Sequence, residues 1–138
     1  MEKQALTWND HRHSVGISSI DQQHRQMVAL VNALNDAIAH NRHWEEVQKM
    51  LEELLRFTTT HFAHEETLMR DHGFPQLKQH EAEHQALIAS ATNLLNKITP
   101  NRPTRAAIAS AFFTDWAEQH ILHADKDVGE FLASKGLE

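Results

Sequence analysis

The segment VQKMLEELLRFTTTHFAHEETLMRDHG, residues 47–73, decides the fold. Its apolar residues advance in steps of three and four from Val47 to Leu54, which keeps them on one stripe of an α-helix. The same stripe continues through His61 and Glu65, where a buried helix face ordinarily carries leucine. The segment therefore predicts a long helix with polar groups in the middle of its buried face.

Three further segments have the same helical period, and no segment shows the alternation typical of a β-strand. Their apolar stripes run over residues 20–38, 77–98 and 104–120. Helices of about 20 to 28 residues, joined by short loops, predict an all-α fold, an antiparallel up-down-up-down four-helix bundle. Ser18 or Ser19 is expected to cap the first helix.

Length and composition narrow the class of protein. A chain of 138 residues has the size of one domain, so we expect a single domain over residues 1–138, with an N-terminal arm over residues 1–17 and the bundle over residues 18–138. The net charge of -6, without a long basic run, argues against nucleic acid as a partner. No apolar run predicts a membrane span or a signal peptide, so we expect a cytoplasmic protein. The absence of cysteine excludes disulfides, thiolate nucleophiles and iron–sulfur clusters.

The abnormal feature of the composition is its twelve histidines. Several of them, together with one glutamate, fall on the stripes that face the bundle core. An unpaired carboxylate in a core is costly, and each buried imidazole needs a partner for its ring nitrogens. A single histidine of this kind is usually a hydrogen-bonded core residue, but six polar groups on facing stripes are too many for that interpretation. These six are His24, His61, Glu65, His80, His84 and His120.

The spacing of these residues indicates a metal site. His80 and His84 are four residues apart on one helix face, a common chelating pair for a transition metal. His61 and Glu65 repeat this spacing on the neighbouring helix. One such pair alone is weak support, because solvated pairs at this spacing are frequent. Two pairs on core stripes, with a histidine from each remaining helix, favour a buried metal site over a structural polar network.

Five imidazoles exceed the number that one ion normally takes from a protein, so the pattern favours two metal ions with Glu65 as a bridge. Asp125 is the candidate for a second carboxylate, but it lies about 140° around an ideal helix from His120. Either the fourth helix contains a π-bulge or ends after His120, or His123 is the ligand in place of Asp125. Spacing alone leaves these alternatives open.

Four sequence blocks around these residues resemble the bacterial hemerythrins. They are IDQQHR at 20–25, HFAHEETLM at 61–69, GFPQLKQHEAEH at 73–84 and WAEQHILHADK at 116–126. Any one block alone would be a weak match, whereas four blocks in order and at matching intervals are highly specific. The resemblance extends over nearly the whole chain.

The resemblance implies a non-haem di-iron centre, with two iron ions joined by an oxo or hydroxo bridge. His80, His84 and His120 would hold one iron, and His24 and His61 the other. Glu65 and Asp125 would bridge the two ions. The family pattern thus selects Asp125 over His123, and it implies the helix distortion described above.

The resemblance also implies an apolar oxygen pocket beside the ligands, formed here by Met27, Phe62, Trp116, Ala117 and Ile121. This chain departs from the family pattern at two positions. Hemerythrins of this type often have leucine where this chain has Ala117, and tyrosine where it has Val128. The smaller Ala117 side chain predicts easier access for water, and hence faster autoxidation.

The function that follows is reversible binding of dioxygen, for storage, delivery or scavenging, by a protein that is not an enzyme. The alternatives are a di-iron peroxidase or oxidase and a module that senses oxygen or nitric oxide. We expect a monomer, with an oxygen-consuming protein as a candidate partner. A histidine-rich site also accepts zinc, manganese or cobalt in vitro, so the residues themselves do not identify the metal.

Overall fold

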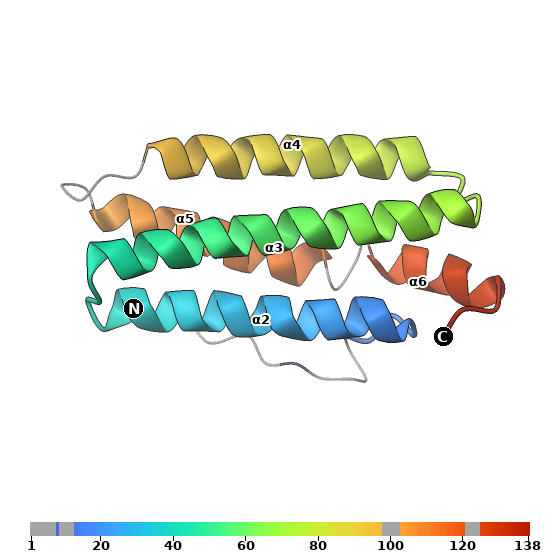
Figure 1. Ribbon diagram of the computed structural model, residues 1–138, viewed down its shortest axis with the longest axis horizontal. Coiled ribbons are helices and arrows are strands. Elements are labelled where there is room, and N and C mark those ends of the chain that lie inside the picture. Colours follow the sequence, from blue (N-terminus) through green and yellow to red (C-terminus); the bar gives the residue numbers. More distant parts are fainter. Residues whose placement is uncertain (1–7, 9–12, 98–102, 121–124) are drawn as a thin grey trace.

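The structure is a computed structural model that describes residues 8, 13–97, 103–120 and 125–138, apart from the side chains of residues 103–105 and 125. Its described part contains helices and no strand (Figure 1). The helices are α2 (Ser18–Ala39), α3 (Trp44–Asp71), α4 (Leu77–Asn96), α5 (Pro103–Gln119) and α6 (Asp125–Ser134). Helices α2 to α5 run alternately up and down, and each contacts its neighbours around a ring. The predicted four-helix bundle is therefore confirmed.

The last helix of the bundle is interrupted near the predicted metal ligands. Helix α5 ends at Gln119, His120 has π-helical hydrogen bonding, and α6 begins at Asp125. The intervening residues 121–124 lie outside the described part of the chain. An interruption at this point is what the spacing between His120 and Asp125 requires if both residues are to serve one site.

Two apolar clusters fill the bundle, with a polar layer between them. One cluster, which includes Met27, Leu54 and Phe113, joins α2, α3, α4 and α5. The other, which includes Ile20 and Met69, lies at the end where α6 packs. Along α2, His24 comes between Ile20 and Met27, so the polar layer is enclosed by apolar side chains on both sides.

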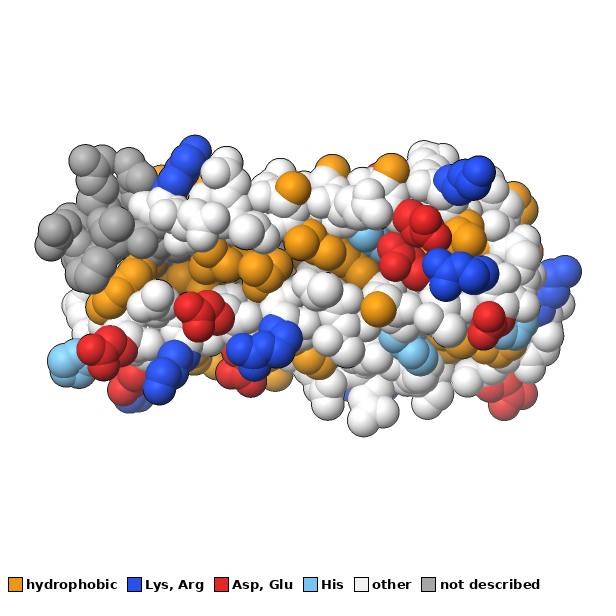
Figure 2. Space-filling model, turned by 45° about the horizontal axis from the view of Figure 1, so that its top comes forward, with side chains coloured by type: hydrophobic (Ala, Val, Ile, Leu, Met, Phe, Trp, Pro, Cys, Tyr) orange, Lys and Arg blue, Asp and Glu red, His pale blue; other side chains and the backbone are white. Residues whose placement is uncertain are grey.

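Helix α4 is buried less deeply than its sequence pattern predicts. Only His80, His84 and Ala91 are fully buried, whereas the leucines on the same stripe are half-buried. Figure 2 accordingly shows a band of apolar side chains along the surface of the bundle. None of the described helices has the length and apolarity needed to cross a membrane.

The first helix begins without the predicted serine cap. The residue at the N-cap position is Ile17, and no side chain caps the helix, so that prediction is wrong. Ser19 is instead engaged by His64, with 2.9 Å between the hydroxyl and Nε2. Asp21, one turn into the helix, accepts hydrogen bonds from the backbone N–H of Val15 (2.8 Å) and the hydroxyl of Ser14 (2.5 Å). This buried carboxylate ties the chain before α2 to the bundle.

The same part of the arm packs closely against α6. A Cβ atom added to Gly129 would lie 2.2 Å from the carbonyl oxygen of Val15 and 2.7 Å from its Cβ. Only glycine therefore allows α6 to approach the backbone at Val15. Most of the rest of the expected arm, residues 1–7 and 9–12, lies outside the described part of the chain.

We predict that Gly129→Ala lowers the free energy of unfolding by about 1 to 3 kcal/mol, because the added methyl group must displace the arm. The sign is informative, because alanine normally stabilises an unhindered helix position by about 0.5 to 1 kcal/mol relative to glycine. Urea unfolding followed by circular dichroism measures the difference. A more stable variant would show that α6 does not pack on Val15.

Candidate metal centre

Four side chains meet in the polar layer, three from α2 and α3 and one from the residue that follows α5. Helix α2 provides His24, α3 provides His61 and Glu65, and His120 follows the end of α5. One nitrogen or oxygen atom from each residue lies within 4.8 Å of all the others. All four side chains are buried, and Glu65 is 0% exposed. The i, i+4 spacing on α3 places His61 and Glu65 on the same inward face.

The nitrogen and oxygen atoms of this group are as close to one another as the ligands of a single metal ion. His61 Nε2 lies 3.2 Å from the Nε2 atoms of both His24 and His120. It also lies 2.6 Å from Glu65 Oε1, which is 3.0 Å from His120 Nε2. A proton on one nitrogen can be directed at only one of these neighbours. Hydrogen bonds among the four groups therefore cannot satisfy all of them.

Gln23 determines which ring nitrogen of His61 carries the proton. Its amide oxygen lies 2.7 Å from His61 Nδ1 and accepts the hydrogen bond that this ring nitrogen donates. In the neutral imidazole, Nε2 then carries a lone pair and no proton. This lone pair faces the Glu65 carboxylate, and two acceptors at 2.6 Å repel each other unless a proton or a metal cation lies between them.

The carboxylate of Glu65 supports the same conclusion. Its second oxygen, Oε2, is buried and has no hydrogen-bond partner among the described residues. A buried carboxylate with an unsatisfied oxygen carries a large desolvation cost. Carboxylate oxygens and imidazole nitrogens are typical ligands of iron and other transition metals. The four residues therefore fit a bound metal cation, and Glu65 Oε2 is free to reach a second one.

His84 and His80 extend this group toward the surface without joining it. The His84 ring centroid lies 6.0 Å from that of His120, and the His80 centroid lies 6.1 Å from that of His84. Glu66 Oε1 accepts a hydrogen bond from His84 Nδ1 at 3.2 Å. Of the seven ligands expected from the sequence, the structure thus gathers four, places two alongside, and leaves the side chain of the seventh, Asp125, outside its description.

Among the described residues expected to form the oxygen pocket, Phe62 and Trp116 contact ligand rings. Met27, Phe62 and Ala117 are fully buried. Trp116 is half-buried and stacks on the His120 ring at 4.7 Å between centroids. The Phe62 ring lies parallel to His84 at 3.8 Å. Ile121 lies outside the described residues. Two aromatic rings of the expected pocket therefore lie against candidate ligands.

Two residues that support the ligands were not found by sequence analysis. Gln23 and Glu66 bond to the outer nitrogens of His61 and His84, and such partners fix the orientation of a metal-binding imidazole. Each directly adjoins a candidate ligand in the sequence, which is the only signal that they carry. Burial lowers the pKa of the nearby His64, His61 lowers it further, and Glu65 opposes the decrease.

Comparison with known proteins agrees with this geometry. The model of the hemerythrin HHE cation-binding domain matches residues 15–132. The chain belongs to the hemerythrin family. This hemerythrin is 29% identical over 129 residues to a bacteriohemerythrin of Methylococcus capsulatus, covering 94% of this chain and 98% of the relative. It is 39% identical over 83 residues to a bacteriohemerythrin of Pseudomonas paraeruginosa, covering 60% of this chain and 53% of the relative.

Solved structures show that the likeness extends to the arrangement of the helices. A crystal structure of wild-type hemerythrin matches with a TM-score of 0.79 and 26% identity, over 94% of this chain and 99% of that one. A leucine-to-alanine mutant of hemerythrin matches with a TM-score of 0.78 and 27% identity, over 93% and 97% of the two chains. The cluster of histidine and glutamate residues thus lies in a bundle of hemerythrin type.

We predict that Gln23→Ala weakens metal binding by about 10-fold to 100-fold, because His61 loses the partner that holds its ring and its tautomer. Gln22→Ala, at the exposed neighbouring position, is the control and should bind like the wild type. Competition of Co²⁺ against a chromophoric chelator measures the affinity. Equal affinities for the two variants would contradict the role given to Gln23.

Proposed function

We propose that this hemerythrin binds dioxygen reversibly at a non-haem di-iron centre. The observation that supports the proposal is the buried convergence of His24, His61, Glu65 and His120 on one point, with Glu65 Oε2 left over for a second ion. His80, His84 and Asp125 complete the proposed ligand set. The two ferrous ions, when bound, supply the electrons by which dioxygen is held.

The composition of the proposed ligand set favours binding over oxygen activation. Ferritin-like di-iron proteins use four carboxylates and two histidines. In this chain five imidazoles and two carboxylates take their place, so most of the ligand set is neutral. Neutral nitrogen ligands stabilise high oxidation states less than anionic oxygens do, which suits a site that must return to its ferrous state.

The residues around the ligands contribute by excluding water. Met27, Phe62 and Ala117 are buried, the Phe62 ring stacks on His84, and Trp116 covers one face of His120. An apolar lining withholds the protons and water that would let reduced oxygen leave and so oxidise the site irreversibly. The Gln23 and Glu66 hydrogen bonds hold His61 and His84 in place throughout.

A second candidate function is a di-iron oxidase or peroxidase. The observation in its favour is Ala117, because its side chain is smaller than the leucine that hemerythrins often have at this position, three residues before His120. Steady consumption of a reducing substrate with peroxide would identify this activity. The expected cytoplasmic location and monomeric state stay predictions.

The experiment that tests the proposed function uses protein loaded with Fe²⁺ under argon, with iron counted per chain. We expect two irons per chain and a visible absorption band that appears on exposure to air and disappears again under argon. A band that appears once and does not reverse would contradict reversible binding and favour the oxidase. Fewer than two irons per chain would contradict the di-iron centre.

We predict that Ala117→Leu lengthens the lifetime of the air-induced band, because the larger side chain excludes water. Ala117→Gly should shorten it, so the three proteins should fall in the order of side-chain size. Because Ala117 is 0% exposed, leucine is expected to cost about 1 to 3 kcal/mol through overpacking, and circular dichroism must show that the variant is folded. Lifetimes that do not follow side-chain size would refute the role of Ala117.

A further inference from the structure

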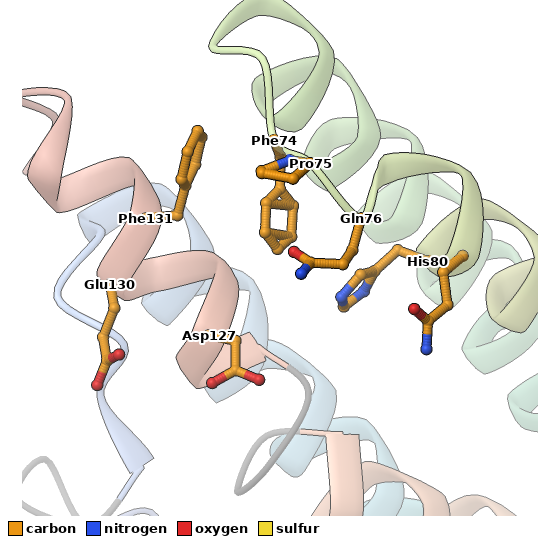
Figure 3. Close-up of a pocket in the computed structure, with 8 residues that line it drawn as sticks. Phe74, Pro75, Gln76, His80, Asp127, Glu130 and Phe131 are labelled. Carbon is orange, nitrogen blue, oxygen red and sulfur yellow. The ribbon is translucent and has the colours of Figure 1, made fainter.

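A cleft of about 610 Å³ lies between α6 and the start of α4, beside the proposed metal centre (Figure 3). One wall is formed by Phe74 and Gln76 before α4, and by Gln79 and His80 on its first turn. Asp127 and Glu130 lie on α6, which forms the opposite wall. The cleft thus joins a proposed metal ligand to two carboxylates that have no place in the metal centre.

His80 faces this cleft with its ring nitrogens available. Its residue is 9% exposed, and Figure 3 shows the ring directed into the space between the walls. Among the described residues none forms a hydrogen bond or ion pair with this ring, whose contacts are aromatic. The Phe74 ring lies 5.3 Å from it and the His84 ring 6.1 Å. The nitrogens of this nine-tenths buried imidazole are not sealed off from solvent, so an ion that enters the cleft can reach them.

The charges of the cleft favour a cation as that ligand. Asp127 and Glu130 are exposed and acidic, and no lysine or arginine is among the residues of the lining. Asp127 and Glu130 do not converge with His80 on one point as the buried group does, so their charge attracts a hydrated divalent ion and the imidazole offers it a first nitrogen ligand. An anion would meet two negative charges here. Asp127 also lies in the first turn of α6, where its charge favours the helix, but Glu130 has no such role.

A line of imidazoles connects the cleft with the buried group. The His80 ring centroid is 6.1 Å from that of His84, which is 6.0 Å from that of His120. His120 Nε2 is 3.0 Å from Glu65 Oε1, which has no exposed surface of its own. Imidazole rings therefore follow one another at about 6 Å from the cleft to the buried group, and each offers a nitrogen ligand to a cation.

We propose that this cleft is the site where Fe²⁺ is collected from solution and passed to the metal centre. Asp127 and Glu130 attract the hydrated ion, and His80 is the first protein ligand that it meets. The inference rests on the proposed di-iron function, because a route for iron requires a centre that holds it. It assigns to Asp127 and Glu130 the role of positioning the incoming ion, outside the final ligand set.

The test measures the rate at which the full-length apoprotein takes up Fe²⁺ under argon, by stopped-flow absorbance at low ionic strength. For the double variant Asp127→Asn/Glu130→Gln we expect uptake to slow by about fivefold to tenfold, because electrostatic attraction raises association rates by factors of this size or more. The final iron content should remain that of the wild type. Added salt should reduce the difference, because it screens exposed charges.

The matched control is Glu45→Gln/Glu53→Gln on α3. Both residues are exposed, and Glu45 lies in the first turn of its helix as Asp127 does. The control removes the same two charges at a place outside the cleft, so its uptake rate should change by less than about twofold. Equal slowing of both double variants would mean that only the overall charge matters, which would overturn the proposal.

A second pair of variants adds a charge instead of removing one. Gln79→Lys places a cation on the wall of the cleft and should slow uptake, whereas Gln85→Lys, exposed farther along α4, should not. Uptake at the wild-type rate in both Gln79→Lys and the cleft double variant would refute the route. If the wild-type chain itself takes up fewer than two irons, the di-iron function fails. If it takes up two irons and the cleft variants load equally fast, only the route fails.

Discussion

The structure depends on one electrostatic constraint, the burial of the Glu65 carboxylate among three imidazoles. Glu65 is 0% exposed, and one of its oxygens has no hydrogen-bond partner among the described residues. A negative charge in this position destabilises the fold unless a cation is bound beside it. The surrounding imidazoles offer nitrogen lone pairs, which satisfy a metal ion and cannot all satisfy one another. Metal binding and folding are therefore expected to be coupled in this hemerythrin.

The rest of the bundle excludes water from this polar layer and holds its side chains in place. Apolar clusters lie on both sides of it, and aromatic rings cover His84 and His120. Because the chain is interrupted between α5 and α6, helix α6 begins close to the polar layer. The chain before α2 closes that end through the Asp21 hydrogen bonds and the contact between Val15 and Gly129. The cleft at the end near α6 reaches the proposed ligand His80.

Helical periodicity predicted most of the architecture, because a buried stripe with a period near 3.6 residues is visible in sequence. The stripe through Val47, His61 and Glu65 is buried as expected. The stripe on α4 was placed correctly but its depth was not, since burial depends on how closely the neighbouring helices approach. The serine cap was predicted wrongly because Asp21 holds the preceding chain instead, a contact that no local pattern signals.

The ligands of the proposed metal centre could be predicted from the sequence better than the residues around them. Histidines on buried stripes are conspicuous, and four of the proposed ligands do converge. Gln23 and Glu66 were missed because a glutamine or glutamate beside a ligand looks like any residue of a solvated face. The cleft at His80 was also invisible, because residues 74–80 and 127–131 come together only in the folded chain. The ligands can be found from sequence because they fall on the periodic buried stripes. Their hydrogen-bond partners and the cleft that leads to them depend on how distant segments pack in the folded chain.

The measurement that tests the central claim most directly is a crystal structure of the iron-loaded protein, with anomalous diffraction data collected at the iron absorption edge. We expect two iron peaks in the polar layer, each within bonding distance of Glu65 and of at least two of the proposed histidine ligands. Protein that is folded and crystallised from excess Fe²⁺ but shows no peak in the layer, or only one, would contradict that claim.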